Sequence, residues 1–549
     1  MCMTRHSARA RLALTLAACF VLCSCSRPAS AERSAANPGT IPGVLRIASQ
    51  QEPETMSPLS SEQYIDTDLS MLWASYLFLW SDKNELVPDL ATQVPTQANG
   101  GISADGKTIT YHLRSNVVWH DGAPFTAKDV VFTWHAILNP RNLTGTKVCY
   151  ELIKSIASPD VHTIIVHLKR PYSPFVATFF SMASEAYSVM PAHLLAKYHD
   201  LNDVPYNVIP VGTGPFIVVS NEGGKIRFVA NRRYWRGPPR LHEIDFEWLR
   251  DDASLVRELA AHRVDLYLES AQSLEPELHG ISGTTIYLYP FTRFSDIGFN
   301  LGRPPLRDIR VRRALAYATD RTALIDRVSR GVNLPADTDQ PRGSWAHADG
   351  IRSNPYDPYR AVLLLNEAGW KRGTDGIRRK QGAPLRLVMV GELGSATALA
   401  AETEIAREWR AVGVQLRIKN YPSALLYATK SGGGIQQNGR FDVTFEQWGN
   451  GVDPDDSQLF DCDQAPPAGW NIYFYCDRAL DAAEERATTD YSIATRKRDY
   501  AAVQRILAAD LPIVPVWFVQ RQDIANIDLR GYRPANAVSP LWNSWEWQM

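Results

Sequence analysis

The strongest constraint on the fold is an alternation between strand-like and helix-like segments. The segments "LRLVMV" at 385–390 and "VQLRIKNY" at 414–421 have the pattern of strands, and a helical pattern near 400–412 lies between them. A strand, a helix and a second strand in this order are typical of a βαβ unit, whose two strands run parallel in one sheet. The pattern therefore predicts an α/β fold.

The size of the chain requires more than one lobe. A chain of 549 residues is longer than the length at which a single hydrophobic core stops growing, so at least two lobes are expected. Four prolines and glycines between Pro210 and Pro215 indicate a crossing between lobes. The net charge of −1 gives no electrostatic signature of a nucleic-acid-binding protein.

A strand followed by a capped helix is predicted between residues 108 and 138. The segment "TITYHLR" at 108–114 alternates apolar and polar residues, as a half-buried strand does. Thr126 is a suitable N-cap, and Asp129 lies three residues later, where its side chain can reach back to the amide of Thr126. A helix is therefore expected to begin after Thr126.

His120 and Asp121 lie between these two elements, and their role can be interpreted in two ways. A neighbouring His and Asp can be a catalytic pair, but Asp121-Gly122 is also a turn signal, because glycine readily adopts a positive φ. We interpret His120 and Asp121 as part of a turn.

A group of arginines near residue 310 is assigned to a solvated helix face. Asp308 is expected to cap this helix, and no aromatic residues are interleaved with the basic ones. The arginines are Arg307, Arg310, Arg312 and Arg313.

The N-terminus has the features of an export signal. Residues 1–24 combine basic residues with an apolar run too short to span a bilayer, which is typical of a signal peptide. The segment "LCSC" at 22–25 resembles a lipobox, so we expect residues 1–24 to be a lipoprotein signal peptide and Cys25 to be acylated. A plain secretory signal that is cut nearby is the alternative. Residues 25–43 are expected to form a flexible tether.

Export places the remaining cysteines in an oxidising compartment. Of the seven cysteines, three lie in the signal and Cys25 is the expected lipid attachment site. Cys149, Cys462 and Cys476 remain, so one of them stays unpaired or pairs between molecules.

The motif search argues against several enzyme classes. The sequence contains no G-x-S-x-G, no H-E-x-x-H and no phosphate-binding P-loop. A hydrolase such as a glycosidase, using a pair of carboxylates, is the rival hypothesis, and an interaction scaffold is a third. No cofactor and no metal are expected. A set of aspartates can be read as a calcium loop but lacks the glycine and glutamate of an EF-hand, so a solvated, helix-capping loop is preferred. These residues are Asp453, Asp455, Asp456, Asp461 and Asp463.

Seven segments, in order, carry a resemblance to a known family. They are "YHLRSNVVWHDGAPFTAKDVVFTW", "PVGTGPF", "NRRYWRGPPRLHEIDF", "FNLGRPPLRDIRVRRALAYATDR", "YDPYRAVLLLNEAGW", "FDVTFEQWGNGVDPDD" and "RDYAAVQRILAADLPIVPVWF". The chain resembles the extracytoplasmic solute-binding proteins of family 5, the oligopeptide- and dipeptide-binding receptors of ABC importers. The resemblance implies a two-lobed periplasmic-binding-protein-like fold with two hinge crossings and an extra α/β domain, which closes on its ligand.

The resemblance also suggests a division into domains. The expected parts are 44–70, 209–290 and 516–549 for lobe I, 71–208 for the extra domain and 291–515 for lobe II.

The expected ligand groove follows one strand of lobe II. Trp448 matches a tryptophan platform of the family, and the small residues Gly449, Asn450 and Gly451 would let a ligand approach the backbone. Dipeptide-type members carry an amine-binding aspartate at the position of Gly451, so Asp453 is the nearest acidic candidate for a cationic group.

A second position of the groove departs from the family pattern. Glu392 stands where dipeptide-type members hold the ligand carboxylate with an arginine. Because two carboxylates repel each other, a cationic or a neutral ligand is expected there.

The resemblance implies a Cys462–Cys476 disulfide, which would leave Cys149 as the free thiol. The overall expectation is a monomeric, lipid-anchored receptor in the periplasm or cell envelope. It would deliver a peptide or peptide-like solute to ABC permease subunits, and it would not be an enzyme.

Overall fold

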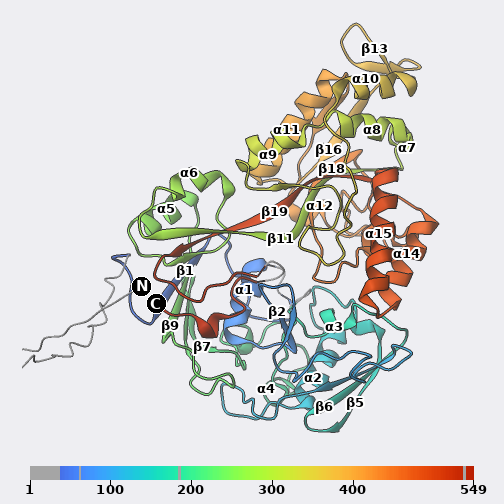
Figure 1. Cartoon of the computed structure of the whole chain (residues 1–549). Helices are drawn as coiled ribbons and strands as arrows, with labels where there is room; N and C mark the ends of the chain where they lie inside the picture. Colours follow the sequence, from blue (N-terminus) through green and yellow to red (C-terminus); the bar gives the residue numbers. More distant parts are fainter. Residues whose placement is uncertain (1–36, 61–62, 183–186, 536–538) are drawn as a thin grey trace, which may run out of the picture.

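The computed structural model describes residues 37–60, 63–182, 187–535 and 539–549 (Figure 1). The expected signal peptide and Cys25 lie outside these residues. Within the described ranges, every helix is too short or too polar to span a bilayer.

An 11-stranded mixed sheet runs through the molecule, in the order β17-β16-β18-β11-β19-β10-β1-β9-β8-β7, with β12 paired to β19. Its strands are β1 (Val44–Ser49), β7 (Phe216–Glu222), β8 (Lys225–Ala230), β9 (Glu243–Trp248), β10 (Leu266–Tyr267), β11 (Thr284–Phe299), β12 (Leu334–Pro335), β16 (Arg386–Val390), β17 (Gln415–Ile418), β18 (Val443–Gly449) and β19 (Ile513–Asn526).

Two long strands, β11 and β19, join the two halves of this sheet. Figure 1 shows them crossing side by side from the part that contains β1 and β9 to the part that contains β16 and β18. The strands are antiparallel, and their register shifts between Pro290 and Phe294. Before the shift β11 pairs with β19 alone, whereas from Arg293 onward it also pairs with β18. The chain therefore passes between the lobes twice, once in each of these strands.

Lobe I and the extra domain share one hydrophobic core. The buried residues of this core run without a break from Leu45 and Phe246 in the large sheet to Tyr111 and Val166 in the extra domain. A separate core packs α5 (Asp252–Ala260) against the other face of the lobe I strands. Lobe II has its own cores. The structure thus has two bodies, lobe I with the extra domain and lobe II.

The extra domain contains a three-stranded sheet of order β4-β6-β5 and a two-stranded ribbon, β2-β3. Its elements and the neighbouring helix of lobe I are α1 (Tyr64–Trp73), β2 (Phe78–Trp80), β3 (Leu86–Pro88), β4 (Thr108–His112), α2 (Ala127–Leu138), β5 (Ile153–Asp160), β6 (Thr163–Leu168), α3 (Phe175–Thr178) and α4 (Ala192–Leu195).

Lobe II contains the predicted βαβ unit. Strands β16 and β17 are parallel neighbours, and α11 (Ala396–Ala411) joins them, so this prediction is confirmed. A small sheet of β13 (Lys371–Arg372), β14 (Arg378–Lys380) and β15 (Ala383–Pro384) follows α10 (Pro358–Glu367). The remaining helices of the chain are α6 (Glu275–Leu278), α7 (Pro304–Arg307), α8 (Ile309–Tyr317), α9 (Arg321–Ser329), α10 (Pro358–Glu367), α12 (Ser423–Leu426), α13 (Ser457–Phe460), α14 (Arg478–Thr489) and α15 (Ile493–Asp510).

One of the four arginines assigned to a solvated face is buried. Asp308 caps α8 as predicted, because its side chain accepts a hydrogen bond from the amide of Arg310. Arg312, however, is only 5% exposed. Its guanidinium donates to the carbonyl oxygens of Asp510 and Leu511 at the end of α15 and to that of Leu306. Unpaired carbonyls at a helix C-terminus attract a cation, which explains why this arginine is inside.

The turn between β4 and α2 forms as predicted. Gly122 has a φ of 97°, and α2 begins after Thr126 with the expected capping box to Asp129. Asp129 also accepts from the amide of Ala192 at 2.9 Å. The aspartate therefore ties the start of α2 to the segment that leads into α4.

His120 holds the turn against the segment that returns to lobe I. Its Nδ1 accepts from the amide of Gly212 at 3.2 Å, so the proton lies on Nε2, which faces the carbonyl of Gly214 at 3.1 Å. A Cβ on Gly212 would come within 1.8 Å of the carbonyl oxygen of Trp73, so only glycine fits there. Burial lowers the pKa of His120 to about 4. The Pro210–Pro215 stretch therefore links the extra domain to lobe I, and the crossings between lobes I and II are β11 and β19.

Candidate functional site

Three pockets follow the boundary between the two bodies. The largest, about 900 Å³, lies between residues 146–148 of the extra domain and residues 429–470 of lobe II. A second, about 350 Å³, joins Tyr64 of α1 to lobe II. The third, about 110 Å³, has Trp80 on one side and Trp345 on the other. The two bodies thus meet along a cleft.

The 350 Å³ pocket, called here the central pocket, lies where β11 crosses between the lobes. Five structural units contribute to it: α1, the paired strands β11, β18 and β19, the loop after β16, the start of α11, and the segment after α12. Its lining residues are Tyr64, Arg293, Glu392, Ser395, Thr397, Ala398, Tyr427, Phe445, Glu446, Gln447, Gly449 and Trp517.

Two of the candidates from the sequence, Glu392 and Gly449, line this pocket together. Glu392 is half-buried and accepts a hydrogen bond from the hydroxyl of Ser423. Gly449 is opposite Arg293 in the β11–β18 pair and is exposed. The fold therefore brings together two residues that are 57 positions apart in the chain.

Arg293 is a pocket residue that sequence reasoning missed. Its guanidinium lies 3.6 Å from the ring centre of Tyr64 and 4.7 Å from that of Phe291. No sequence motif marks this arginine. Its position in the pocket follows from the register of β11 against β18, which only the structure gives.

The next two candidates line the 110 Å³ pocket. Asn450 and Gly451 border it, beside Phe291 and Trp345. Asn450 is buried, and its side-chain amide donates to the carbonyl oxygen of Asp339 at 3.1 Å. The loop after β18 therefore lies between two pockets, with Gly449 on one side and Asn450 and Gly451 on the other.

Trp448 does not line these pockets. It is paired with Phe294 across β11 and β18 and packs, partly buried, against the core of lobe II. Because side chains alternate along a strand, Trp448 points to the opposite face from Gln447 and Gly449.

Asp453 lies away from the central pocket and is already paired. Its carboxylate accepts a hydrogen bond from the guanidinium of Arg496, which is 4% exposed. Burial raises the pKa of Asp453, and the charge of Arg496 opposes this rise. The carboxylate of Asp453, which the sequence suggested as a partner for a cationic ligand, is thus neutralised by Arg496.

Behind the central pocket two carboxyl groups face each other across β11 and β18. Asp296 is opposite Glu446, is fully buried, and has no hydrogen-bond partner for either oxygen among the described residues. Burial raises the pKa of Asp296 well above its usual range, and the neighbouring Glu446 adds to the rise. Glu446 accepts a hydrogen bond from Gln436 at 2.9 Å.

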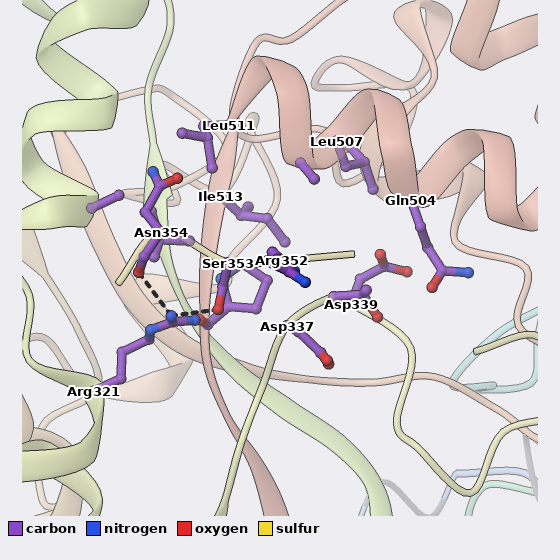
Figure 2. A pocket seen from close by; sticks show the side chains of 15 residues that line it. Arg321, Asp337, Asp339, Arg352, Ser353, Asn354, Gln504, Leu507, Leu511 and Ile513 are labelled. Carbon is purple, nitrogen blue, oxygen red and sulfur yellow. Dashed lines mark hydrogen bonds between the residues drawn. The ribbon is translucent and has the colours of Figure 1, made fainter. Parts of the chain in front are cut away.

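A further pocket inside lobe II is too small for a solute of peptide size. Figure 2 shows it between α9, α15 and the loop that carries Asp337 and Asp339, and its volume is about 30 Å³. Arg321 at its edge donates to the carbonyl oxygens of Ala336 and Asn354. Such a volume holds about one water molecule, so we assign this pocket to packing.

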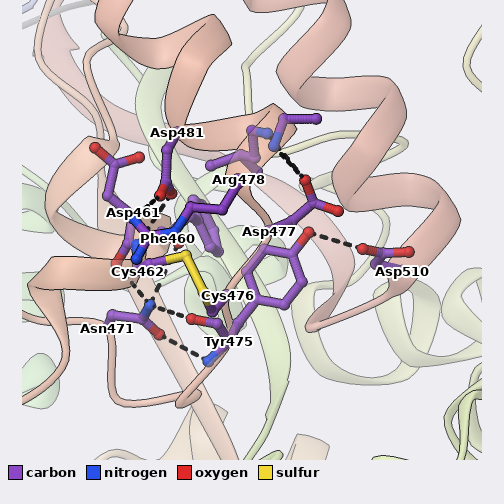
Figure 3. The surroundings of a disulfide bond; sticks show 12 residues. Phe460, Asp461, Cys462, Asn471, Tyr475, Cys476, Asp477, Arg478, Asp481 and Asp510 are labelled. Carbon is purple, nitrogen blue, oxygen red and sulfur yellow. Dashed lines mark hydrogen bonds and ion pairs between the residues drawn. A yellow bond between two sulfur atoms is a disulfide. The ribbon is translucent and has the colours of Figure 1, made fainter.

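The acidic segment after β18 is fastened by a disulfide. The structure joins Cys462 to Cys476, as the resemblance implies (Figure 3). Cys149 is a buried free thiol. Beside the disulfide, Asp477 caps α14 and Asp481 accepts from the amide of Cys462. In the described part of the chain no group of three or more His, Cys, Asp and Glu has the geometry to hold a metal ion. Of the aspartates in the candidate calcium loop, Asp455 accepts hydrogen bonds from Ser457 and Tyr172, and Asp463 accepts one from Gln464.

Comparisons with known proteins agree with this architecture. Residues 85–467 match the family described as bacterial extracellular solute-binding proteins, family 5 Middle. The chain is 27% identical to the dipeptide-binding protein of Escherichia coli (strain K12), over 91% of this chain and 92% of that protein. NikZ from Campylobacter jejuni, solved in complex with Ni(L-His), is 26% identical, with a TM-score of 0.78 over 93% of this chain and all of that one.

A third protein shares the fold at lower identity. The oligopeptide-binding protein AppA from Bacillus subtilis, solved with a nonapeptide, has a TM-score of 0.75 at 22% identity and covers 92% of this chain and 99% of its own. Family members are substrate-binding proteins of ABC importers rather than enzymes, and they act outside the cytoplasm. With two lobes, two crossing strands and a cleft between them, the chain belongs to the bacterial extracellular solute-binding proteins of family 5.

Proposed function

We propose that the protein is a lipid-anchored receptor that traps one peptide-like solute between its lobes and delivers it to the permease subunits of an ABC importer. The observation that carries this proposal is the row of pockets along the boundary between two bodies that are joined by β11 and β19. Two crossing strands allow lobe II to rotate as a hinged body, so that the cleft can close on a ligand. The domain division expected from the resemblance is part of this proposal.

We place the bound solute in the central pocket and along the loop from Gly449 to Gly451. Gly449 leaves backbone groups open to the ligand, and Trp448 supports the loop from its other face. Glu392 faces the ammonium or another cationic group of the solute. Asp453 serves to fix the loop through Arg496. Peptide ligands are supported by the relatives named for dipeptides and oligopeptides.

Native mass spectrometry of the protein, purified without denaturation, tests this function. The proposal predicts one retained small molecule of peptide-like mass per chain, released unchanged when the protein is unfolded. Incubation of wild-type protein with a peptide library and with oligosaccharides distinguishes capture from the glycosidase hypothesis. Stoichiometric retention of a peptide without any product supports a receptor, whereas turnover of either substrate contradicts it.

The lipid anchor is a separate part of the proposal and has its own test. If Cys25 is acylated, wild-type protein partitions into the membrane fraction, and the Cys25→Ala variant is recovered from the soluble fraction. Cys149→Ala is the matched control and should stay with the membrane. A wild-type protein that is soluble and begins at another residue would contradict anchoring without affecting solute binding.

A further inference from the structure

Three carboxyl groups are buried together in the part of lobe II that faces the extra domain. Asp339 belongs to the loop shown in Figure 2, Asp456 to the loop after β18, and Glu484 to α14. Asp339 and Asp456 are 2% exposed, and Glu484 is fully buried. Asp456 is in hydrogen-bond contact with both of the other carboxyl groups. We call these three residues the carboxyl triad.

The triad has more acceptor oxygens than donors. Gln340 donates to Asp339 at 2.7 Å and to Asp456 at 3.4 Å. Among the described residues, no donor reaches Oδ1 of Asp456 or either oxygen of Glu484. A contact between two carboxyl groups is a hydrogen bond only when one of them carries a proton. The two contacts within the triad therefore need two protons.

The cations around the triad are engaged elsewhere. Arg496 is bound to Asp453 and to the carbonyl oxygen of Ala487. His347 donates to the carbonyl oxygen of Gln340 at 2.8 Å. Arg352 borders the same small pocket as Asp339, but it is exposed and forms no ion pair within the described ranges. The other titratable groups near the triad are Asp453, Asp455, Asp461 and Tyr500. Protons, rather than these cations, thus neutralise the triad.

Two members of the triad are tied to the walls of the cleft. Tyr172 of the extra domain donates to Asp455, the residue before Asp456, at 2.7 Å. The carbonyl oxygen of Asp339 accepts from the side-chain amide of Asn450, which borders the 110 Å³ pocket, at 3.1 Å. A movement of either carboxyl group would therefore change a wall of the cleft.

The third member lies in a helix that touches the extra domain. The amide of Ser173 donates to the carbonyl oxygen of Thr488, one turn after Glu484 in α14, at 2.7 Å. The hydroxyl of Ser173 donates to the carbonyl oxygen of Ala487 at 3.2 Å. Because Ser173 belongs to the extra domain and α14 to lobe II, both bonds exist only while the two bodies are in contact.

Ionisation of the triad would drive these segments apart. Carboxylates without a cation repel each other and require water, which a buried site does not provide. Given the proposed function, we propose that the carboxyl triad is a proton-loaded latch. Its bound protons hold lobe II against the extra domain, and their loss at higher pH loosens this contact and speeds release of the solute. Opening and ionisation favour each other, because the coupling between them is reciprocal.

The direction of the pH dependence follows from burial. Burial raises the pKa of all three carboxyl groups, and neighbouring acids add to the rise at Asp456 and Glu484. Where the triad becomes hydrated, its carboxyl groups ionise near their usual pKa of about 4. The stabilisation of the closed arrangement is therefore complete below about pH 4, and it is lost as the pH rises through the pKa of the buried triad.

Hydrogen exchange at the amide of Ser173 tests the latch without any ligand, because this N–H bonds across the two bodies. Mass spectrometry resolved to single residues, corrected for the intrinsic effect of pH on exchange, gives the equilibrium for opening of the contact. Between pH 7 and pH 9 the imidazole of His120 is neutral in both the folded and the unfolded protein. In this range opening should increase by up to about tenfold per pH unit for each proton released.

Variants assign the effect to the triad. Glu484→Gln should reduce the dependence on pH and leave the contact more closed than in wild-type protein at pH 9, because the amide does not ionise and still donates to Asp456. A contact that is closed more firmly cannot result from misfolding. Infrared spectra at pH 7 should show a weaker C=O stretch of protonated carboxyl groups in this variant.

Glu408→Gln is the matched control. Glu408 is another buried acid of lobe II, it accepts from the amide of Asp320 at 2.9 Å in α11, and burial raises its pKa to about 7. This substitution removes a buried carboxyl group away from the extra domain. Exchange at Ser173 should therefore keep the pH dependence of wild-type protein.

The outcomes separate the latch from the receptor function. Opening that is independent of pH in wild-type protein, or an unchanged slope in Glu484→Gln, overturns the inference, while retention of a peptide would still support the receptor. If Ca²⁺ slows exchange at Ser173 in wild-type protein but not in Glu484→Gln, the triad holds a cation instead of protons and the inference is overturned. If the predicted slope is found but the protein retains no solute and does not contract with peptide, the proposed function fails while the proton-linked contact stands.

Discussion

At the scale of single residues, the protein neutralises its buried charges with partners that are distant in sequence. Arg312 is surrounded by carbonyl oxygens, Asp453 is paired with Arg496, and Arg521 is paired with Asp68 although 453 positions separate them. In each case burial would be costly without the partner. A charged side chain without an ion-pair partner among the described residues, such as Arg293, is therefore a candidate for binding a ligand.

His120 makes the stability of the fold dependent on pH. Its imidazole is neutral in the folded protein because Nδ1 accepts a hydrogen bond and burial lowers the pKa from 6.5 to about 4. An unfolded chain binds a proton at this histidine at a higher pH than the folded one does. The stabilisation is thus complete above pH 6.5 and is lost as the pH falls toward about 4.

We expect the His120→Gln variant to lose much of this pH dependence. For wild-type protein the histidine should account for a decrease of roughly 2–3 kcal/mol in the free energy of unfolding across that pH range. Urea unfolding at pH 7.5 and at pH 5 measures the difference. A variant of the exposed His199, His199→Gln, is the control. Equal pH dependence of His120→Gln and wild-type protein would rule out this role.

Residue types and spacing predicted some site features and missed others. The capping box at Thr126 and the turn at Gly122 follow from local chemistry, so the sequence was sufficient to predict them. Arg293 was missed because strand register decides which side chains share a pocket. Trp448 packs, partly buried, against the core of lobe II, and its predicted contact with the ligand stays a prediction.

At the scale of elements, a disulfide and a set of interdomain hydrogen bonds restrain the part of lobe II that faces the extra domain. The Cys462–Cys476 bond closes a loop between two residues 14 positions apart. This loop includes residues that line the largest pocket, such as Gln464 and Trp470. Fixing the loop keeps one wall of the cleft in place when ligand is absent.

Removal of the disulfide by the double substitution Cys462→Ser and Cys476→Ser should lower the free energy of unfolding by about 3 kcal/mol, because the unfolded chain gains freedom. Denaturant unfolding checks this value. Peptide mapping without reduction should show the linked pair, and Cys149 should react with an alkylating agent only after unfolding. Rapid alkylation of all three cysteines in the folded protein would contradict the pairing.

Hydrogen bonds between the extra domain and lobe II form only while the two bodies are together. Tyr172 donates to Asp455 at 2.7 Å, and Tyr491 donates to the carbonyl oxygen of Gly106 at 2.8 Å. A rotation of lobe II about β11 and β19 away from the extra domain would break both. These contacts therefore favour the arrangement in which the cleft is narrow.

The Tyr172→Phe variant should bind solute more weakly without any change in the pocket. Loss of one such hydrogen bond should destabilise the closed arrangement relative to the open one by about 0.5–1.5 kcal/mol. The ligand should then dissociate faster. Stopped-flow dissociation of a bound peptide measures the rate, with Tyr198→Phe on the surface as the control. An unchanged dissociation rate in Tyr172→Phe would show that this contact does not influence closure.

The elements themselves were largely predictable, whereas their grouping was not. The βαβ unit of lobe II and the cap at Asp308 follow from periodicity and helix-terminus chemistry. Periodicity does not show that the extra domain shares a core with lobe I, because that depends on contacts between residues such as Leu45 and Val166 that belong to different sheets. The shared core determines which parts move together.

At the scale of the whole molecule, the shared core makes lobe I and the extra domain one body, and lobe II the other. All three pockets along their boundary have walls from both bodies. A ligand that contacts both walls binds the closed arrangement more tightly than the open one, so binding shifts the population toward closure. Closure is the step by which a receptor of this kind would signal to a permease that it is loaded.

Small-angle X-ray scattering, with and without a bound peptide, tests the central claim most directly. The protein is freed of retained solute by reversible unfolding and measured before and after saturation with a peptide that it binds. Capture between hinged lobes predicts a smaller radius of gyration for the loaded protein, with one peptide per chain. A radius of gyration that stays the same when the peptide is stoichiometrically bound would contradict the account.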